Sequence, residues 1–246
     1  MFRFFLLILV LGIIPIFGAE SVKIPTMNFE LSAPDSPQQL VSSLNVLVLL
    51  TLLFLAPSMV LVMTTFTRFV IVFGFLRQAL GTQQVPPTQL LVMLAMILTF
   101  FVMEPVGIKA YEDGIKPYVE KKIGYEEAFD KTTLPFKNFM IRNTREKDLA
   151  LFLRIRKMEN PATVADVPLS IVIPAFVISE LKTAFEIGFL LFLPFLVIDM
   201  VVASILMSMG MMMLPPVMIA LPFKILIFIL IDGWNLLIGN LIASIK

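Results

Sequence analysis

The segment from Pro222 to Trp234 most constrains this chain, because it places Lys224 and Asp232 within an otherwise apolar run. A charge at the centre of a membrane helix costs roughly 2.5–3.5 kcal/mol even on a lenient insertion scale. Two such charges in one segment are therefore expected to face protein or a water-filled path, and not lipid. The segment predicts a chain that belongs to a membrane assembly.

The composition argues against several classes of function. Hydrophobic residues make up 59% of the chain and the net charge is +1, so nothing indicates a nucleic-acid partner. Cysteine and histidine are both missing, which removes thiolate ligands, the commonest general base and nearly every zinc site. We therefore expect no enzyme activity, no cofactor and no metal.

The N-terminus has the form of a secretory signal. Arg3 precedes a short apolar core at residues 4–17, and Ala19 and Ser21 suit a cleavage site. The sequence predicts a signal peptide over residues 1–21, with a retained membrane anchor as the alternative. The polar, proline-containing residues 22–43 are expected to form a linker.

Three regions follow, and together they predict an all-α, polytopic membrane chain. Residues 44–103 are expected to form a first apolar helical hairpin, interrupted by a basic loop with Arg68 and Arg77. Residues 104–168 hold most of the charges, and we expect a small, soluble, extracytoplasmic helical domain there. Residues 169–246 are expected to form a second apolar hairpin.

The second hairpin should have arms at about 185–209 and 217–243, and the charges suggest its orientation. A short, purely basic loop at Arg68 and Arg77 should be cytoplasmic, which places the charged domain outside. Both hairpins share a glycine followed by Pro-Pro at one spacing, typical of a helix stop and restart. These predicted tip residues are Gly81, Pro86, Pro87, Gly210, Pro215 and Pro216.

The predicted tip of the second hairpin is rich in methionine, with six in residues 207–218. Methionine is unbranched and polarisable, so a ring of such tips could seal a hole and repack around varied objects. The alternatives are ordinary core packing or a loop at the membrane surface.

Charged residues also interrupt the apolar sequence of the second hairpin. One interpretation is an ion or proton relay. The other, which we favour, is structural pairing within and between subunits, because a buried charge needs a partner. Glu186 can lie near Lys182, one turn away. The set comprises Glu180, Lys182, Glu186, Asp199, Lys224 and Asp232.

Several of these segments resemble signatures of the FliP proteins of the bacterial flagellar export gate. The resemblance spans about residues 45–245, and injectisome homologues share it, although the signal-like N-terminus favours the flagellar branch. Its motifs lie at Thr67–Gly81, Pro86-Pro87, Thr144–Phe152, Pro174–Gly188, Met209–Pro216 and Pro222–Trp234.

The resemblance implies a core subunit of the type III protein export gate in the bacterial inner membrane, within the flagellar basal body. In that family several copies, typically five, form a channel with FliQ and FliR proteins for unfolded flagellar subunits. It also implies a methionine gasket around the closed pore and charged residues at subunit contacts. The gasket would comprise Met209, Met211, Met212 and Met213, and the contacts Glu180, Lys182, Asp199, Lys224 and Asp232.

Two rival functions stay open at this point. A secondary transporter or ion channel would use broken membrane helices to bind an ion or solute. An intramembrane hydrolase would need a nucleophile and a base, and the Ser and Lys residues form no convincing arrangement.

Overall fold

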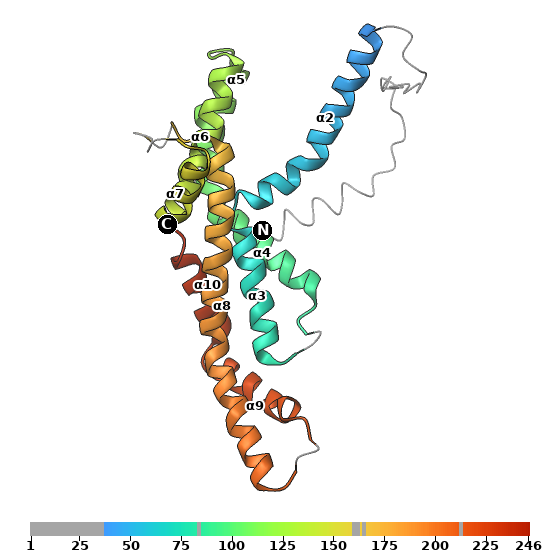
Figure 1. Cartoon of the computed structure of the whole chain (residues 1–246), viewed down its shortest axis with the longest axis vertical. Coiled ribbons are helices and arrows are strands. Elements are labelled where there is room, and N and C mark those ends of the chain that lie inside the picture. The colour runs from blue at the N-terminus through green and yellow to red at the C-terminus, as the bar shows by residue number, and fades with distance from the viewer. Residues whose placement is uncertain (1–36, 83–84, 159–162, 164–165, 212–213) are drawn as a thin grey trace, which may run out of the picture. The chain divides into compact units, whose positions relative to one another are not determined.

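The computed structural model describes residues 37–82, 85–158, 163, 166–211 and 214–246 (Figure 1). The predicted signal peptide and most of the predicted linker therefore lie outside the described residues. The chain divides into two compact units, Met1–Leu49 and Leu50–Lys246, and the boundary falls within the first described helix. Everything below concerns the second unit unless stated.

The described residues form helices and contain no strand, which confirms the all-α prediction. The elements in chain order are α2 (Pro37–Val62), α3 (Phe66–Leu80), α4 (Thr88–Ala110), the π-helix η1 (Tyr111–Ile115), α5 (Lys116–Val119), α6 (Tyr125–Asn143), α7 (Glu146–Ile155), α8 (Leu169–Ser208), α9 (Pro216–Leu230) and α10 (Gly233–Ala243).

The basic loop predicted between the first two apolar segments is wrong, because Arg68 and Arg77 lie on helix α3. Apolar residues of α3 recur three and four positions apart and bury one face, including Phe69, Val72, Phe73 and Leu76. The helix ends at Gly81, whose positive φ suits a C-terminal cap. The predicted linker also ends early, since residues 37–43 already belong to α2.

The charged domain is built on the ends of two apolar helices. α4 runs past the expected boundary at residue 104 and continues through η1 into α5 (Figure 1). α6 and α7 then return toward α8, which starts at Leu169. Asn143 ends α6, and α7 begins at Glu146.

α8 is one continuous helix of 40 residues that carries two internal prolines, Pro174 and Pro194. The first arm predicted at 185–209 is thus the second half of a longer element. At about 1.5 Å per residue the helix is about 60 Å long. Figure 1 shows it running from beside α6 and α7 to the turn before α9.

The second arm, predicted as one helix over 217–243, is two helices. α9 and α10 meet at a 65° bend. Asp232 lies at the bend with φ of +52°, and Gly233 follows it. A side-chain carbon on Gly233 would come within 2.4 Å of the Phe228 ring, so only glycine allows this close approach.

Two hydrophobic clusters hold the unit together. The first joins α3 and α4 to α8, α9 and α10, with Phe73 and Leu76 almost fully buried. Phe75 of α3 rests directly on Gly188 of α8, where an added carbon would approach its ring to 2.3 Å. A larger residue at position 188 would therefore push the two helices apart.

The second cluster joins the charged domain to the apolar helices. Phe139 and Met140 of α6 pack with Val172 and Phe176 of α8, and the Phe139 and Phe176 ring centroids are 6.1 Å apart. The domain thus shares its core with the start of α8, as its small size requires.

Two stretches are long and apolar enough to cross a membrane, Thr88–Val119 and Leu169–Ser208, and α9 with α10 would form a third if the bent pair counts as one span. These assignments rest on length and composition. Large apolar side chains nevertheless remain exposed along α4, α8 and α9. Such surface in a chain of this kind needs lipid or protein to cover it.

Candidate functional site

Arg68 and Glu180 form a fully buried ion pair between α3 and α8. The Arg68 Nε–H donates to Glu180 Oε2 at 2.8 Å, and Nη2 bonds Glu180 Oε1, so the contact is bidentate. Both side chains are about 2% exposed or less. A buried charge is tolerated only when it is paired and hydrogen-bonded, and this geometry meets both conditions.

The same guanidinium also holds the end of α10. Arg68 Nη1 donates to the Ser244 carbonyl oxygen at 3.0 Å and to the Ser244 hydroxyl at 2.8 Å. One side chain therefore connects α3, α8 and the segment after α10.

Lys224 and Asp199 form the second pair, between α9 and α8. Lys224 Nζ donates to Asp199 Oδ2 at 2.6 Å and to the Ala79 carbonyl oxygen at 3.0 Å. Lys224 is 2% exposed, whereas the Asp199 side chain is 30% exposed. Asp199 Oδ1 is buried and has no hydrogen-bond partner in the described part of the chain.

Glu186 pairs with Arg145, and not with Lys182 as the one-turn spacing had suggested. The Arg145 guanidinium reaches both Glu186 oxygens from the loop between α6 and α7. The Ser179 hydroxyl accepts from the Arg145 backbone N–H at 2.9 Å. The hydrogen bond to Glu186 raises the pKa of Arg145, so this cation stays charged at every relevant pH.

Lys182 and Asp232 stay outside these pairs. Lys182 lies exposed on α8 and forms no ion pair within the described residues. Asp232 is exposed at the α9–α10 bend, and its carboxylate accepts from the Asn235 side-chain amide at 3.2 Å. Of the predicted residues, Asp199 and Lys224 therefore pair with each other. Glu180 pairs with Arg68, which lies outside the predicted set. Lys182 and Asp232 form no ion pair within the described residues.

Sequence reasoning missed Arg68 and Arg145 as pairing partners. Arg68 had been assigned to a cytoplasmic loop, yet the apolar residues that follow it continue at helical spacing. That pattern was the available signal, because a lone arginine on an apolar helix face requires a carboxylate. Nothing in the local sequence of Arg145 points to Glu186, which lies 41 residues away.

The methionine-rich segment connects α8 and α9. Met209 and Met211 are 64% and 41% exposed, and Gly210 between them has φ of +73°. Met212 and Met213 lie outside the described residues. The two described side chains therefore project from a turn and do not belong to either hydrophobic cluster.

The predicted tip residues occupy the two turns. Gly81 caps α3, and Pro86 and Pro87 precede α4. Gly210 follows α8, Pro215 caps α9, and Pro216 is the first residue of α9. Both turns point toward the same end of the unit in Figure 1. Gly81 lies against α9, since an added carbon there would sit 3.3 Å from Val217.

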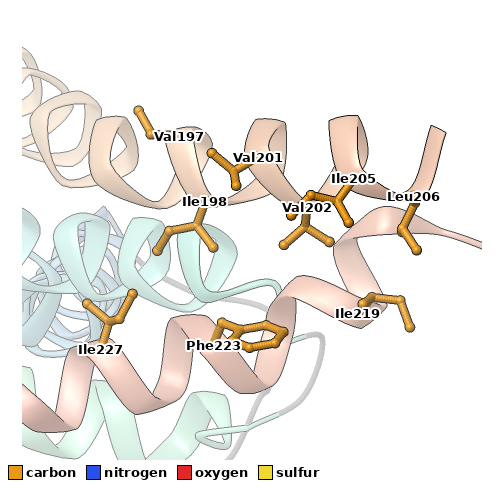
Figure 2. A pocket seen from close by; sticks show the side chains of 9 residues that line it. All are labelled: Val197, Ile198, Val201, Val202, Ile205, Leu206, Ile219, Phe223 and Ile227. Carbon is orange, nitrogen blue, oxygen red and sulfur yellow. The ribbon is translucent and has the colours of Figure 1, made fainter. Parts of the chain in front are cut away.

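A cavity of about 440 Å³ opens between the second half of α8 and α9 (Figure 2). Its nine lining side chains are all apolar, among them Val201, Ile205 and Phe223. Such a wall has no group to coordinate an ion or a polar solute. The described residues also contain no cluster of three or more metal-ligating side chains.

We expect Arg68→Ala to lower the free energy of unfolding by about 3–5 kcal/mol, because it strands the buried Glu180 carboxylate. Lys224→Ala should cost less, since Asp199 is partly exposed. Lys131→Ala removes an exposed pair and should cost about 0.5 kcal/mol or less. Trp234, the single tryptophan, packs on Phe228 and reports unfolding by its fluorescence. Equal losses in all three variants would contradict this ranking.

Comparisons with known proteins agree on one family. The FliP family profile matches residues 49–241. The flagellar biosynthetic protein FliP of Bacillus subtilis is 53% identical over 210 residues, which cover 85% of this chain and 95% of that protein. The FliP of Caulobacter vibrioides is 54% identical over 80% of this chain and 74% of its own length. That of Treponema pallidum is 46% identical over 90% of this chain and 83% of its own length. The chain therefore belongs to the FliP family of flagellar biosynthetic proteins.

Proposed function

We propose that this chain is a core subunit of the flagellar type III protein export gate in the bacterial inner membrane. Several copies, five in the family it belongs to, would form a channel with FliQ-like and FliR-like partners in the basal body. Unfolded flagellar proteins would pass through this channel. The chain would act as a structural subunit and not as an enzyme.

The observation that carries this proposal is the exposed apolar surface of α8. The helix is about 60 Å long, whereas the hydrocarbon core of a bilayer is about 30 Å thick. Exposed apolar side chains continue along it from Ile178 to Met207, a stretch of about 44 Å. Lipid cannot cover an apolar helix of that length when it runs along the membrane normal. Other protein subunits are the natural cover for the remainder.

The buried charges support a structural role more than transport. Arg68 pairs with Glu180, and Lys224 pairs with Asp199, within one chain. A proton or ion relay needs ionisable groups that face an aqueous path and can change partner. The apolar cavity between α8 and α9 offers no such path. A transporter or channel for small ions is therefore the weaker alternative.

The open charges suit contacts with other subunits. Lys182 lies among the exposed apolar residues Phe185 and Ile178, and Asp232 lies at the α9–α10 bend. Each of these groups would gain a partner when subunits pack, and each opposes packing if it finds none.

Co-expression with FliQ-like and FliR-like proteins tests the proposal directly. The purified sample should be a complex of several subunits by native mass measurement. Lys224→Ala should lower its yield, and the matched variant Lys131→Ala should not. A chain that stays monomeric beside both partners would contradict the proposal. Normal assembly of Lys224→Ala with export abolished would instead favour a proton relay at this pair.

The methionine-rich turn is proposed as the seal of the closed channel. Exposed Met209 and Met211 lie at a turn, and in a ring of copies such turns would converge on an axis. Flexible thioethers can close a gap to small ions and still yield to a passing polypeptide.

Replacing Met211, Met212 and Met213 with alanine should make the assembled channel leak. The change shortens the plug and removes no charge pair, so assembly should persist. Ion conductance of the reconstituted complex measures the leak. A control variant replaces three exposed methionines on helices, Met93, Met96 and Met200, and should stay sealed at equal assembly. Intact sealing by the first variant would refute the gasket.

The charged domain, residues 104–168, is proposed to lie outside the cytoplasm. Glu180 neutralises Arg68, so the positive charge that predicts a cytoplasmic first turn rests on Arg77. The chain has no cysteine, which makes single-cysteine labelling clean.

A membrane-impermeant maleimide added to intact spheroplasts should label Lys122→Cys, which lies in the exposed turn after α5. Val85→Cys lies exposed in the turn after α3 and should react only after lysis. The reverse pattern would overturn the proposed topology.

A further inference from the structure

A groove of about 850 Å³ lies between the end of α4 and the second half of α6. Apolar side chains, including Ile108, Pro135 and Ile141, form much of its wall. Three polar side chains also line it: Lys109, Asn138 and Arg142. The groove is thus amphipathic, unlike the wholly apolar cavity between α8 and α9.

The polar groups of this groove have no protein partner within the part of the chain that is described, and Lys109 and Arg142 are exposed. Lys109 and Arg142 form no ion pair there, and the Asn138 amide makes no side-chain hydrogen bond. Glu112 is one turn from Lys109 on the same helical path, yet it neither pairs with Lys109 nor lines the groove. Two cations and an amide donor therefore face a shared space without an anion.

The groove begins where the long apolar stretch of α4 ends. Glu104 is the first charged residue after Arg77. The α4 residues that line the groove, 105–109, occupy about 7 Å of helix beyond it. The headgroup layer on each side of a bilayer is about 5–7 Å thick. If the apolar stretch lies in lipid, Lys109 and Arg142 lie at the level of the phosphates.

An apolar track leads from the groove toward the hydrocarbon. Phe101, Pro105 and Ile108 lie four and seven residues apart, on one face of α4. Phe101 is 64% and Ile108 51% exposed. This face could hold an acyl chain while the cations hold its headgroup. An acidic peptide would use the cations but would leave this track uncovered.

We propose that the groove between α4 and α6 binds one anionic phospholipid. Lys109 and Arg142 bind the phosphate, the Asn138 amide donates to a phosphate oxygen, and an acyl chain runs along Phe101 and Ile108. Cations at the membrane surface attract anionic lipid, and two of them around one phosphate add direct hydrogen bonds. The proposal requires a membrane location and does not depend on the export function.

The full chain is reconstituted in nanodiscs of phosphatidylcholine with or without phosphatidylglycerol, and the lipids retained after extraction are counted by native mass spectrometry. Wild type should retain one phosphatidylglycerol molecule more tightly than the others. Lys109→Gln with Arg142→Gln should weaken its retention about 10- to 30-fold. The matched control, Lys116→Gln with Arg154→Gln, removes two exposed cations of the same domain outside the groove and should behave as wild type.

Two further measurements distinguish binding of a phospholipid from binding of a free anion. Soluble glycerol 3-phosphate should not displace the retained lipid, because it lacks the acyl chain. Ile108→Asn should weaken retention while leaving both cations in place. Equal retention by the groove and control variants, or displacement by glycerol 3-phosphate, would overturn the proposal. Unchanged Trp234 fluorescence in each variant shows that the fold is kept.

Discussion

The contact between Arg68 and Glu180 is the interaction on which the rest of this structure depends. It lies between α3 and α8 in a fully buried position, and the same guanidinium also holds Ser244 after α10. Neither charge has access to water, so each is tolerated only because the other is present. The packing of Phe75 against Gly188 brings the two helices close enough for the pair to form.

Paired charges lie in the interior of the folded chain, whereas its surface is largely apolar. The two most buried ion pairs, Arg68 with Glu180 and Lys224 with Asp199, form within the chain, whereas most of the exposed surface of α8 and α9 is apolar. Exposed charges remain at Lys182 and Asp232. This division is typical of a subunit that folds by its own ion pairs and then packs through apolar faces with a few polar contacts.

The long apolar segments predicted the helical class, and the glycine and Pro-Pro pairs predicted residues that lie at the two turns. What they could not predict depends on contacts between distant residues. Arg68 was read as a loop charge because its partner lies 112 residues further along. The bend at Asp232 depends on a close approach of Phe228 to Gly233, and the continuity of α8 through Pro174 and Pro194 runs against local propensity. Glu180, Glu186, Asp199 and Lys224 were identifiable as candidates, but their partners were not.

The spacing of the buried pair along the chain also constrains biosynthesis. Ribosomes make Arg68 well before Glu180, and Ser244 comes 176 residues after Arg68. Until α8 is made, Arg68 in the first turn of α3 lacks its counter-ion. During that interval the start of α3 is disfavoured in a nonpolar environment. The order of synthesis therefore makes α8 the element that allows Arg68 to be buried.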